Sequence, residues 1–113
     1  MEMQTHPLEG NHAKVVLRGR LDAAGVDRIE AKFVATLVPH GVSGIVDLSQ
    51  VDFVASLGLR MLISVARSLA RKGARLVLFA PQDGVREVFE MALVSELITI
   101  RESEAEALAA LQG

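Results

Sequence analysis

The chain has 113 residues, half of them hydrophobic, which is enough for one core, and we expect residues 1–113 to form a single domain. It has no cysteine and no N-terminal secretory signal, which excludes disulfides, thiolate metal sites and a cysteine nucleophile and fits the reducing cytoplasm. The net charge of −2 and the few aromatic residues argue against nucleic acid as a partner, and apolar stretches shorter than roughly 20 residues argue against direct membrane insertion.

The first half of the chain alternates strand and helix patterns. Residues 13–21 mix β-branched residues in rough alternation and predict a strand, and residues 3–8 predict an earlier one. Apolar residues then recur at helical spacing between a candidate cap at Asp22 and a stop at Pro39, which predicts an amphipathic helix. Residues 42–48 form a short, mostly apolar run that is typical of a buried central strand.

The second half repeats this alternation. We expect residues 49–54 to form a loop that leads into a long helix, which begins near Ser56 and ends at Gly73. The later predicted elements are a strand over 75–80, a helix over 84–94, a short strand over 97–100 and a helix over 103–111. Strand–helix–strand units of about 30 residues favour parallel pairing. The sequence therefore predicts an α/β fold, with a central mixed but mainly parallel sheet of about four to five strands and about four helices packed on it.

Residues that would carry chemistry are few. His6, His12 and His40 share no metal-ligand spacing, and each falls in a predicted loop or edge, so we interpret them as solvated. Neither of the glycine-rich phosphate-binding motifs of nucleotide enzymes is present. Asp47 and Asp52 are interpreted as turn or cap residues. We therefore expect no catalytic residue, no metal site and no cofactor.

Residues 49–58 are the most informative part of the chain. A helix N-terminus presents unpaired N–H groups and a positive dipole end, so Ser56 is interpreted either as a helix cap or as an anion site. Gly58 falls in the first helical turn, where glycine costs about 1 kcal/mol relative to alanine, which indicates a use. That use is either tight packing of the helix against its own sheet or the close approach of a partner.

Two motifs resemble those of a known family. They are Gly19-Arg20-Leu21-Asp22 at a strand end and Asp47-Leu48-Ser49-x-Val51-x-Phe53-Val54-x-Ser56-x-Gly58-Leu59 before the long helix. In this order and spacing, and in a chain of this size, they resemble the STAS domain, the fold of bacterial anti-sigma-factor antagonists. The resemblance extends over almost the whole chain.

The resemblance implies a partner-switching regulator. In its unphosphorylated form such a protein binds an anti-sigma factor that is also a serine kinase, so the sigma factor is released, and phosphorylation breaks the complex. Ser56 occupies the phosphorylation position. Family members usually carry an acidic residue just before this serine and Ser or Thr just after it, whereas this chain has Ala55 and Leu57.

The expected partner-binding surface lies around the start of the long helix. Its expected members are Asp22, Ser56, Leu57, Gly58 and Arg60. At about 100° per residue, one polar stripe along the helix comprises Ser56, Arg60, Ser64, Arg67 and Arg71. Arg60 would pair with a phosphate or a partner carboxylate, or belong to an ordinary solvated face. Asp22 would bind the partner, or serve only as the N-cap of the helix that follows it.

A second hypothesis is a constitutive binding subunit without a phosphorylation switch. STAS domains also occur in signalling scaffolds and as accessory subunits of lipid transport complexes at membranes. An enzyme is disfavoured, because the sequence shows neither a nucleophile–base pair nor a cofactor motif. The identity of the partner and the oligomeric state stay open.

Overall fold

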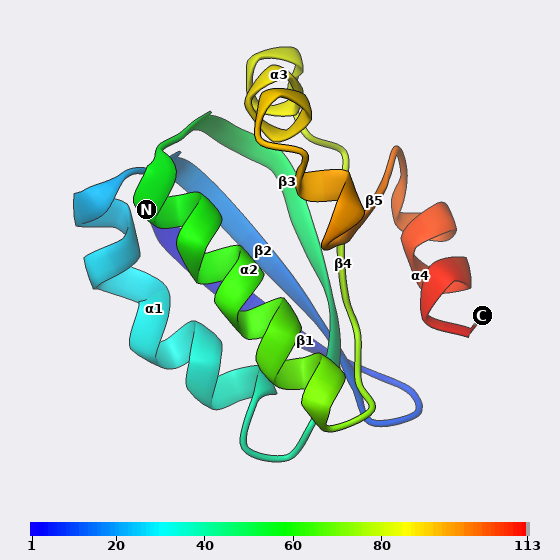
Figure 1. Ribbon diagram of the computed structural model, residues 1–113. Helices are drawn as coiled ribbons and strands as arrows, with labels where there is room; N and C mark the ends of the chain where they lie inside the picture. The colour runs from blue at the N-terminus through cyan, green and yellow to red at the C-terminus, as the bar shows by residue number, and fades with distance from the viewer. Residues whose placement is uncertain (113) are drawn as a thin grey trace.

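The computed structural model describes residues 1–112, which form one five-stranded sheet, four α-helices and a short 3₁₀ helix. The strands are β1 (Glu2–Leu8), β2 (His12–Leu21), β3 (Ser43–Val54), β4 (Leu76–Phe79) and β5 (Thr99–Arg101). The helices are α1 (Ala23–Leu37), α2 (Ser56–Arg71), α3 (Asp83–Met91) and α4 (Glu104–Gln112), and the 3₁₀ helix η1 is Val94–Glu96. The strand order is β1-β2-β3-β4-β5, with β1 antiparallel and the others parallel, which confirms the predicted mixed, mainly parallel α/β fold (Figure 1).

Helices cover the sheet on both faces (Figure 1). On one face α1 and α2 lie side by side, and Phe33 and Leu62 join a core with inward-facing strand residues such as Val15. On the other face α4 packs through a smaller cluster, which consists of Ile45, Val77, Phe79 and Ala107. All four residues of β4 are buried, because the strand is covered on both faces and contributes to both clusters. No helix within residues 1–112 combines the length and the apolar character needed to cross a bilayer.

β3 is longer than the sequence indicates. We expected a loop over 49–54, but β3 covers this segment and pairs in parallel with β2 up to Leu21. Beyond Asp47 the strand has β2 as its paired neighbour and no longer pairs with β4, which ends there. This extension therefore exposes side chains such as Asp52 and buries others such as Val51. The exposed polar residues concealed the strand pattern.

The interpretation of Asp47 and Asp52 as turn or cap residues was wrong, because both lie within β3. Asp47 accepts a hydrogen bond from the N–H of Ser49 at 2.9 Å, inside the strand.

The C-terminal elements also differ slightly from the prediction. α3 ends at Met91, before the predicted limit of 94, and Leu93 follows in a left-handed conformation with φ of 55°. This turn ends the helix and directs the chain into η1, so that β5 begins at Thr99 rather than at 97.

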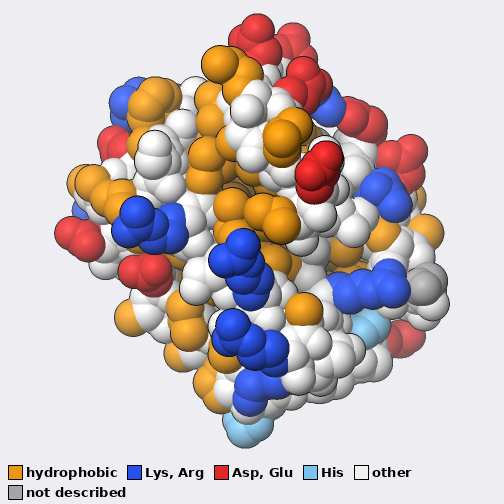
Figure 2. All heavy atoms as spheres, viewed as in Figure 1, with side chains coloured by type: hydrophobic (Ala, Val, Ile, Leu, Met, Phe, Trp, Pro, Cys, Tyr) orange, Lys and Arg blue, Asp and Glu red, His pale blue; other side chains and the backbone are white. Residues whose placement is uncertain are grey.

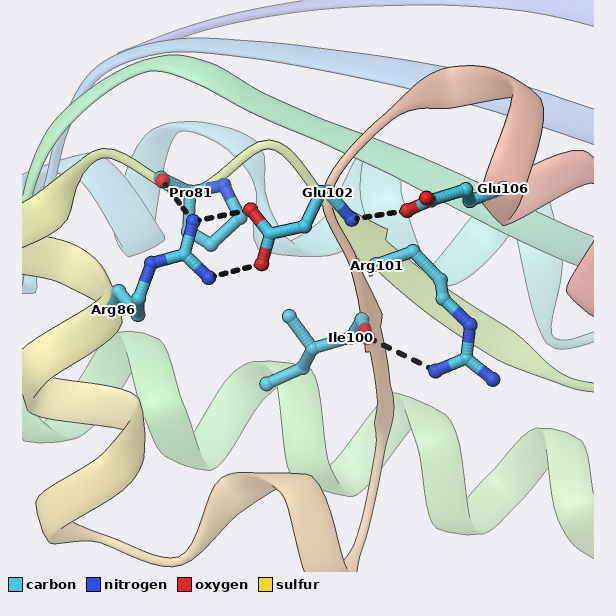
Figure 3. A network of polar contacts seen from close by, with 6 residues as sticks. All are labelled: Pro81, Arg86, Ile100, Arg101, Glu102 and Glu106. Atoms are coloured by element: carbon cyan, nitrogen blue, oxygen red, sulfur yellow. Dashed lines mark hydrogen bonds and ion pairs between the residues drawn. The ribbon is translucent and has the colours of Figure 1, made fainter.

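An ion pair fastens α3 to the end of β5 (Figure 3). The guanidinium of Arg86 donates to both carboxylate oxygens of Glu102, with Nη2 to Oε2 at 2.6 Å, and Nη2 also donates to the Pro81 carbonyl at 3.2 Å. The hydrogen bonds from Arg86 lower the pKa of Glu102, and the same contact raises the pKa of Arg86. The N–H of Glu102 donates to Glu106 at 3.1 Å, which links the pair to α4.

Replacing Glu102 by glutamine is expected to lower the free energy of unfolding slightly at neutral pH. The lowered pKa of Glu102 means that its charge stabilises the fold above the usual value of 4.5 and that this contribution is lost as the pH falls through the lowered pKa. Urea titrations should therefore show a difference between the two proteins that shrinks in acid. Glu87→Gln, at an exposed position of α3, is the control. A difference that stays constant across this pH range would contradict the prediction.

Candidate functional site

The ends of β2 and β3 bring the two sequence motifs together. The strands pair in parallel up to Leu21 and Val54, and the N–H of Ala55 donates to the Leu21 carbonyl at 3.0 Å. Because both strands end at the same edge of the sheet, α1 and α2 begin beside one another there (Figure 1). Asp22 follows directly on the end of β2, and Ser56 comes one residue after Ala55 at the end of β3, so the two lie at the same edge of the sheet.

Asp22 is the N-cap of α1, as one of the two interpretations of this residue held. Its Oδ1 accepts the N–H of Gly25 at 2.9 Å, and its Oδ2 lies 3.3 Å from Nε of Arg20. The Gly25 N–H, followed by Arg20, holds the pKa of Asp22 below its usual value. The carboxylate is thus charged and fixed in direction beside the start of α2.

Ser56 is the first residue of α2, and the interpretation as its cap was wrong. The N-cap is Ala55, which stays extended with φ of −104° and ψ of 174° and makes no side-chain capping bond. The pairing of Ala55 with Leu21 holds it in that conformation. Ser56 is exposed at the positive end of the helix dipole, next to N–H groups that have no intrahelical acceptor. Its hydroxyl is open to chemical modification.

Ala55→Asp is expected to raise the free energy of unfolding by about 1 kcal/mol. An aspartate at this N-cap accepts a hydrogen bond from the first-turn N–H groups, which alanine leaves without a side-chain acceptor. Urea denaturation measures the gain, and Ala31→Asp, at an exposed interior position of α1, serves as the control that should lose stability. No gain at Ala55 would show that the helix start is capped in another way.

Two exposed apolar side chains lie within three residues of Ser56 in the chain. Phe53 is 39% exposed and Leu57 is 42% exposed. The guanidinium carbon of Arg20 lies 4.2 Å from the centroid of the Phe53 ring, and the two residues are partners in the β2–β3 register. We call Arg20, Asp22, Phe53, Ser56 and Leu57 the helix-start surface. It includes an exposed aromatic side chain and an arginine, two residue types that are enriched in protein interfaces.

Arg20 and Phe53 were not among the expected site residues, although both belong to the motifs. Phe53 is an aromatic residue among polar neighbours, and this could have indicated a binding residue in the sequence. Its pairing with Arg20 depends on the strand register, and the segment was taken as a loop. Sequence reasoning therefore had no means to find the pair.

Gly58 is buried, and the structure shows tight packing of its helix against the sheet. A Cβ atom on Gly58 would lie 2.7 Å from the carbonyl oxygen of Leu21 and 2.7 Å from its Cγ. Glycine therefore allows α2 to begin directly against the end of β2. Gly58 holds the two halves of the helix-start surface together and is not exposed to solvent.

Arg60 lines a groove that follows α2. The groove is lined by Ser56, Leu59, Arg60, Ile63, Ser64, Arg67, Ser68, Arg71 and Leu97. The predicted polar stripe is thus present in full. Figure 2 shows basic side chains in a row over α2, between uncharged and hydrophobic surface. Leu97, just after η1, was missed because only the fold places it next to α2.

A metal site or a buried polar site would require particular side chains within residues 1–112. No three His, Asp or Glu side chains gather there as metal ligands, and no polar or charged residue is buried. The features that distinguish the site are an exposed hydroxyl, a fixed carboxylate and apolar side chains on one surface.

The sequence matches a known family and named relatives. The STAS domain family matches residues 4–107. The anti-sigma-B factor antagonist of Listeria monocytogenes is 27% identical over 96 residues, which cover 85% of this chain and 84% of that protein. BtrV of Bordetella bronchiseptica, named as a candidate anti-sigma factor antagonist, is 30% identical over 96 residues, which cover 85% of this chain and 83% of that protein.

The fold also matches solved structures. The anti-sigma factor antagonist SpoIIAA in its unphosphorylated form superposes with a TM-score of 0.82 at 24% identity, over 99% of this chain and 97% of that one. The Bacillus protein SpoIIAA in its phosphorylated form gives a TM-score of 0.68 at 22% identity, over 96% and 98% of the two chains. At these identities the likeness shows the fold alone. With the family match over nearly its whole length and relatives named as antagonists, this chain belongs to the STAS domain family.

Proposed function

We propose that this protein is an anti-sigma-factor antagonist, which binds an anti-sigma factor in the cytoplasm and has no catalytic activity of its own. The observation that carries the proposal is the helix-start surface, where the fixed Asp22 carboxylate, the exposed Ser56 hydroxyl and the apolar Phe53 and Leu57 lie together. The names of the relatives from Listeria and Bordetella support the same class of function.

We propose further that phosphorylation of Ser56 ends this binding. A phosphoserine carries about −1.5 to −2 charges at neutral pH, and at the first position of a helix it is stabilised by the dipole and the free N–H groups. Arg60, one turn further along, adds a favourable charge. The fold therefore tolerates the phosphate, whereas a partner surface matched to a neutral hydroxyl between Phe53 and Leu57 is repelled.

Reconstitution with anti-sigma factors of the source organism tests the proposal. Each is purified and mixed with the full chain, and complexes are followed by size-exclusion chromatography and mass spectrometry. We expect one stable complex that dissociates after ATP and Mg²⁺ are added. A complex that survives ATP without phosphate on Ser56 would identify a constitutive subunit instead. If the protein forms a complex with no anti-sigma factor and is instead purified with a membrane transport complex, the proposal is wrong and the protein is a subunit of that complex.

Arg60→Glu tests whether the surface is placed correctly. It should weaken the complex about tenfold, because a charge that faces the partner is reversed, and should leave the melting temperature nearly unchanged. Lys32→Glu, at an exposed position of α1, makes the same change in net charge and is the control. Equal effects of both substitutions would show that net charge alone matters and that Arg60 lies outside the interface.

A further inference from the structure

The charge of α2 is unusual for this chain. The protein carries a net charge of −2, yet the charged residues of α2 are the three arginines Arg60, Arg67 and Arg71, with no carboxylate among its 16 residues. All three are exposed, and none forms an ion pair or side-chain hydrogen bond with any residue from 1 to 112. A helix face that serves only to contact water usually mixes both signs, since like charges four residues apart repel. Arg67 and Arg71 are such a pair.

Apolar side chains accompany these arginines. In the groove along α2, Leu59 and Ile63 lie on the helix itself, and Leu97 comes from the segment after η1. Leu97 is 51% exposed. No carboxylate lines this groove. In Figure 2 the acidic side chains lie mostly toward the top and the sides of the view, and the basic row runs through its lower centre.

The groove is long enough to receive a helix of several turns. α2 is about 24 Å long at about 1.5 Å per residue, and the groove follows it from Ser56 to Arg71. The arginines are separated by seven and then four residues, so they line one side of the helix over about three turns. A partner helix laid along α2 meets them with acidic residues at matching intervals.

We propose that this groove receives an acidic amphipathic helix of the protein partner. The apolar side of that helix packs on Leu59, Ile63 and Leu97, and its carboxylates pair with Arg60, Arg67 and Arg71. The inference rests on the proposed function, because it extends the contact from the helix-start surface along α2. A docking helix held by this groove extends the contact along α2 as far as Arg71, about four turns from Ser56, so the partner stays near while the serine is modified.

A designed peptide tests the groove without the natural partner. The probe is a stapled helix of about 18 residues with leucines along one side and glutamates at intervals that match the arginines. It is titrated into the isotope-labelled full chain, and amide shifts are followed by NMR. We expect the largest shifts at Arg60, Ile63, Arg67 and Leu97. A peptide with lysine at the glutamate positions should not bind.

Paired variants then separate a specific groove from general charge attraction. Arg67→Glu with Arg71→Glu should weaken peptide binding about tenfold or more, whereas Arg28→Glu with Lys32→Glu, also four residues apart and exposed on α1, should change it less than about twofold. Leu97→Ser should weaken binding without a change in charge. Equal losses in both double variants, or shifts centred away from α2, would overturn the proposal. Tighter binding to anionic phospholipid vesicles than to the peptide would also overturn it.

The outcome is distinct from that of the proposed function. If the peptide fails while an anti-sigma factor still forms a complex sensitive to Ser56 phosphorylation, the groove inference alone is wrong. If the peptide binds the groove but no anti-sigma factor forms a complex, the groove serves a partner of another class and the proposed function is wrong.

Discussion

Ser56→Asp is expected to weaken binding of the anti-sigma partner about 100-fold without lowering the melting temperature. The substitution places a negative charge on the helix-start surface, and a partner surface that is matched to the neutral hydroxyl of Ser56 is repelled by it. The fold itself gains, because an acidic residue in the first turn of a helix contributes about 0.3–1 kcal/mol and α2 has none there. Isothermal titration and thermal melts measure the two effects separately.

Two control variants frame this result. Ser56→Ala keeps the surface neutral, so it should bind like the parent and, because Ser56 is not the cap, should cost little stability. Gln4→Glu adds one negative charge at an exposed position of β1, outside the helix-start surface, and should not affect binding. An aspartate variant that binds as tightly as the parent would remove Ser56 from the interface.

Gly25→Ala is expected to destabilise the protein by about 3 kcal/mol, at the upper end of the usual cost of overpacking. A Cβ atom on Gly25 would lie 2.1 Å from the carbonyl oxygen of Arg20 and 3.2 Å from Cβ of Met1. The first contact is with backbone, so α1 has to move away from the end of β2. This movement also displaces Asp22, which is fixed by the N–H of Gly25.

Gly84→Ala, also in the first turn of a helix, is expected to raise the free energy of unfolding, whereas Gly25→Ala lowers it. Gly84 also lies in the first turn of a helix, but a Cβ atom there meets no atom within 4 Å. Alanine should therefore stabilise the protein by about 0.4–1 kcal/mol through a less flexible unfolded chain. Urea denaturation of both variants tests the pair. A loss of less than about 1 kcal/mol at Gly25 would show that the backbone adjusts more freely than its packing indicates.

Most of the fold follows from patterns in the sequence. The apolar repeat of α2 and the continuous apolar run of β4 have a clear period or composition, and both elements lie where the patterns predict them. The extension of β3 was missed because its pairing with β2 is a long-range contact between two segments, and its polar residues face solvent. The residues of β3 alone do not indicate that β4 ends at Phe79 while β2 continues beside β3 as far as Leu21.

The site was predictable only where it depends on local sequence, because contacts between distant segments are not visible in the sequence. The chemistry of helix starts singled out Asp22 as a candidate N-cap and Ser56 as a cap or an anion site. The N-cap role of Asp22 is confirmed. Of the two interpretations of Ser56, as a helix cap or as an anion site, the first placed the cap one residue too late, because the bond from Ala55 to Leu21 keeps Ala55 outside the helix. Phe53 and Leu97 became visible only when the fold placed them beside Arg20 and α2.

Ala55 and Leu57 depart from the residues usual in the family, and the structure indicates what each changes. Ala55 leaves the helix start without a side-chain cap, at a cost in stability of about 1 kcal/mol. Leu57 places an exposed apolar side chain where a hydroxyl is usual, which adds hydrophobic area to the proposed interface. Neither change removes the Ser56 hydroxyl or its exposure.

We propose that phosphorylation of Ser56 controls partner binding at the helix-start surface. The most direct test is to incubate the parent protein and Ser56→Ala with the partner kinase and ATP, to locate the phosphate by mass spectrometry and to measure the affinity of each product. We expect one phosphate, on Ser56, an affinity reduced about 100-fold in the phosphorylated parent, and an unmodified alanine variant that remains bound. A phosphate on another residue, or a protein phosphorylated on Ser56 that binds as tightly as before, would show that Ser56 does not control partner binding.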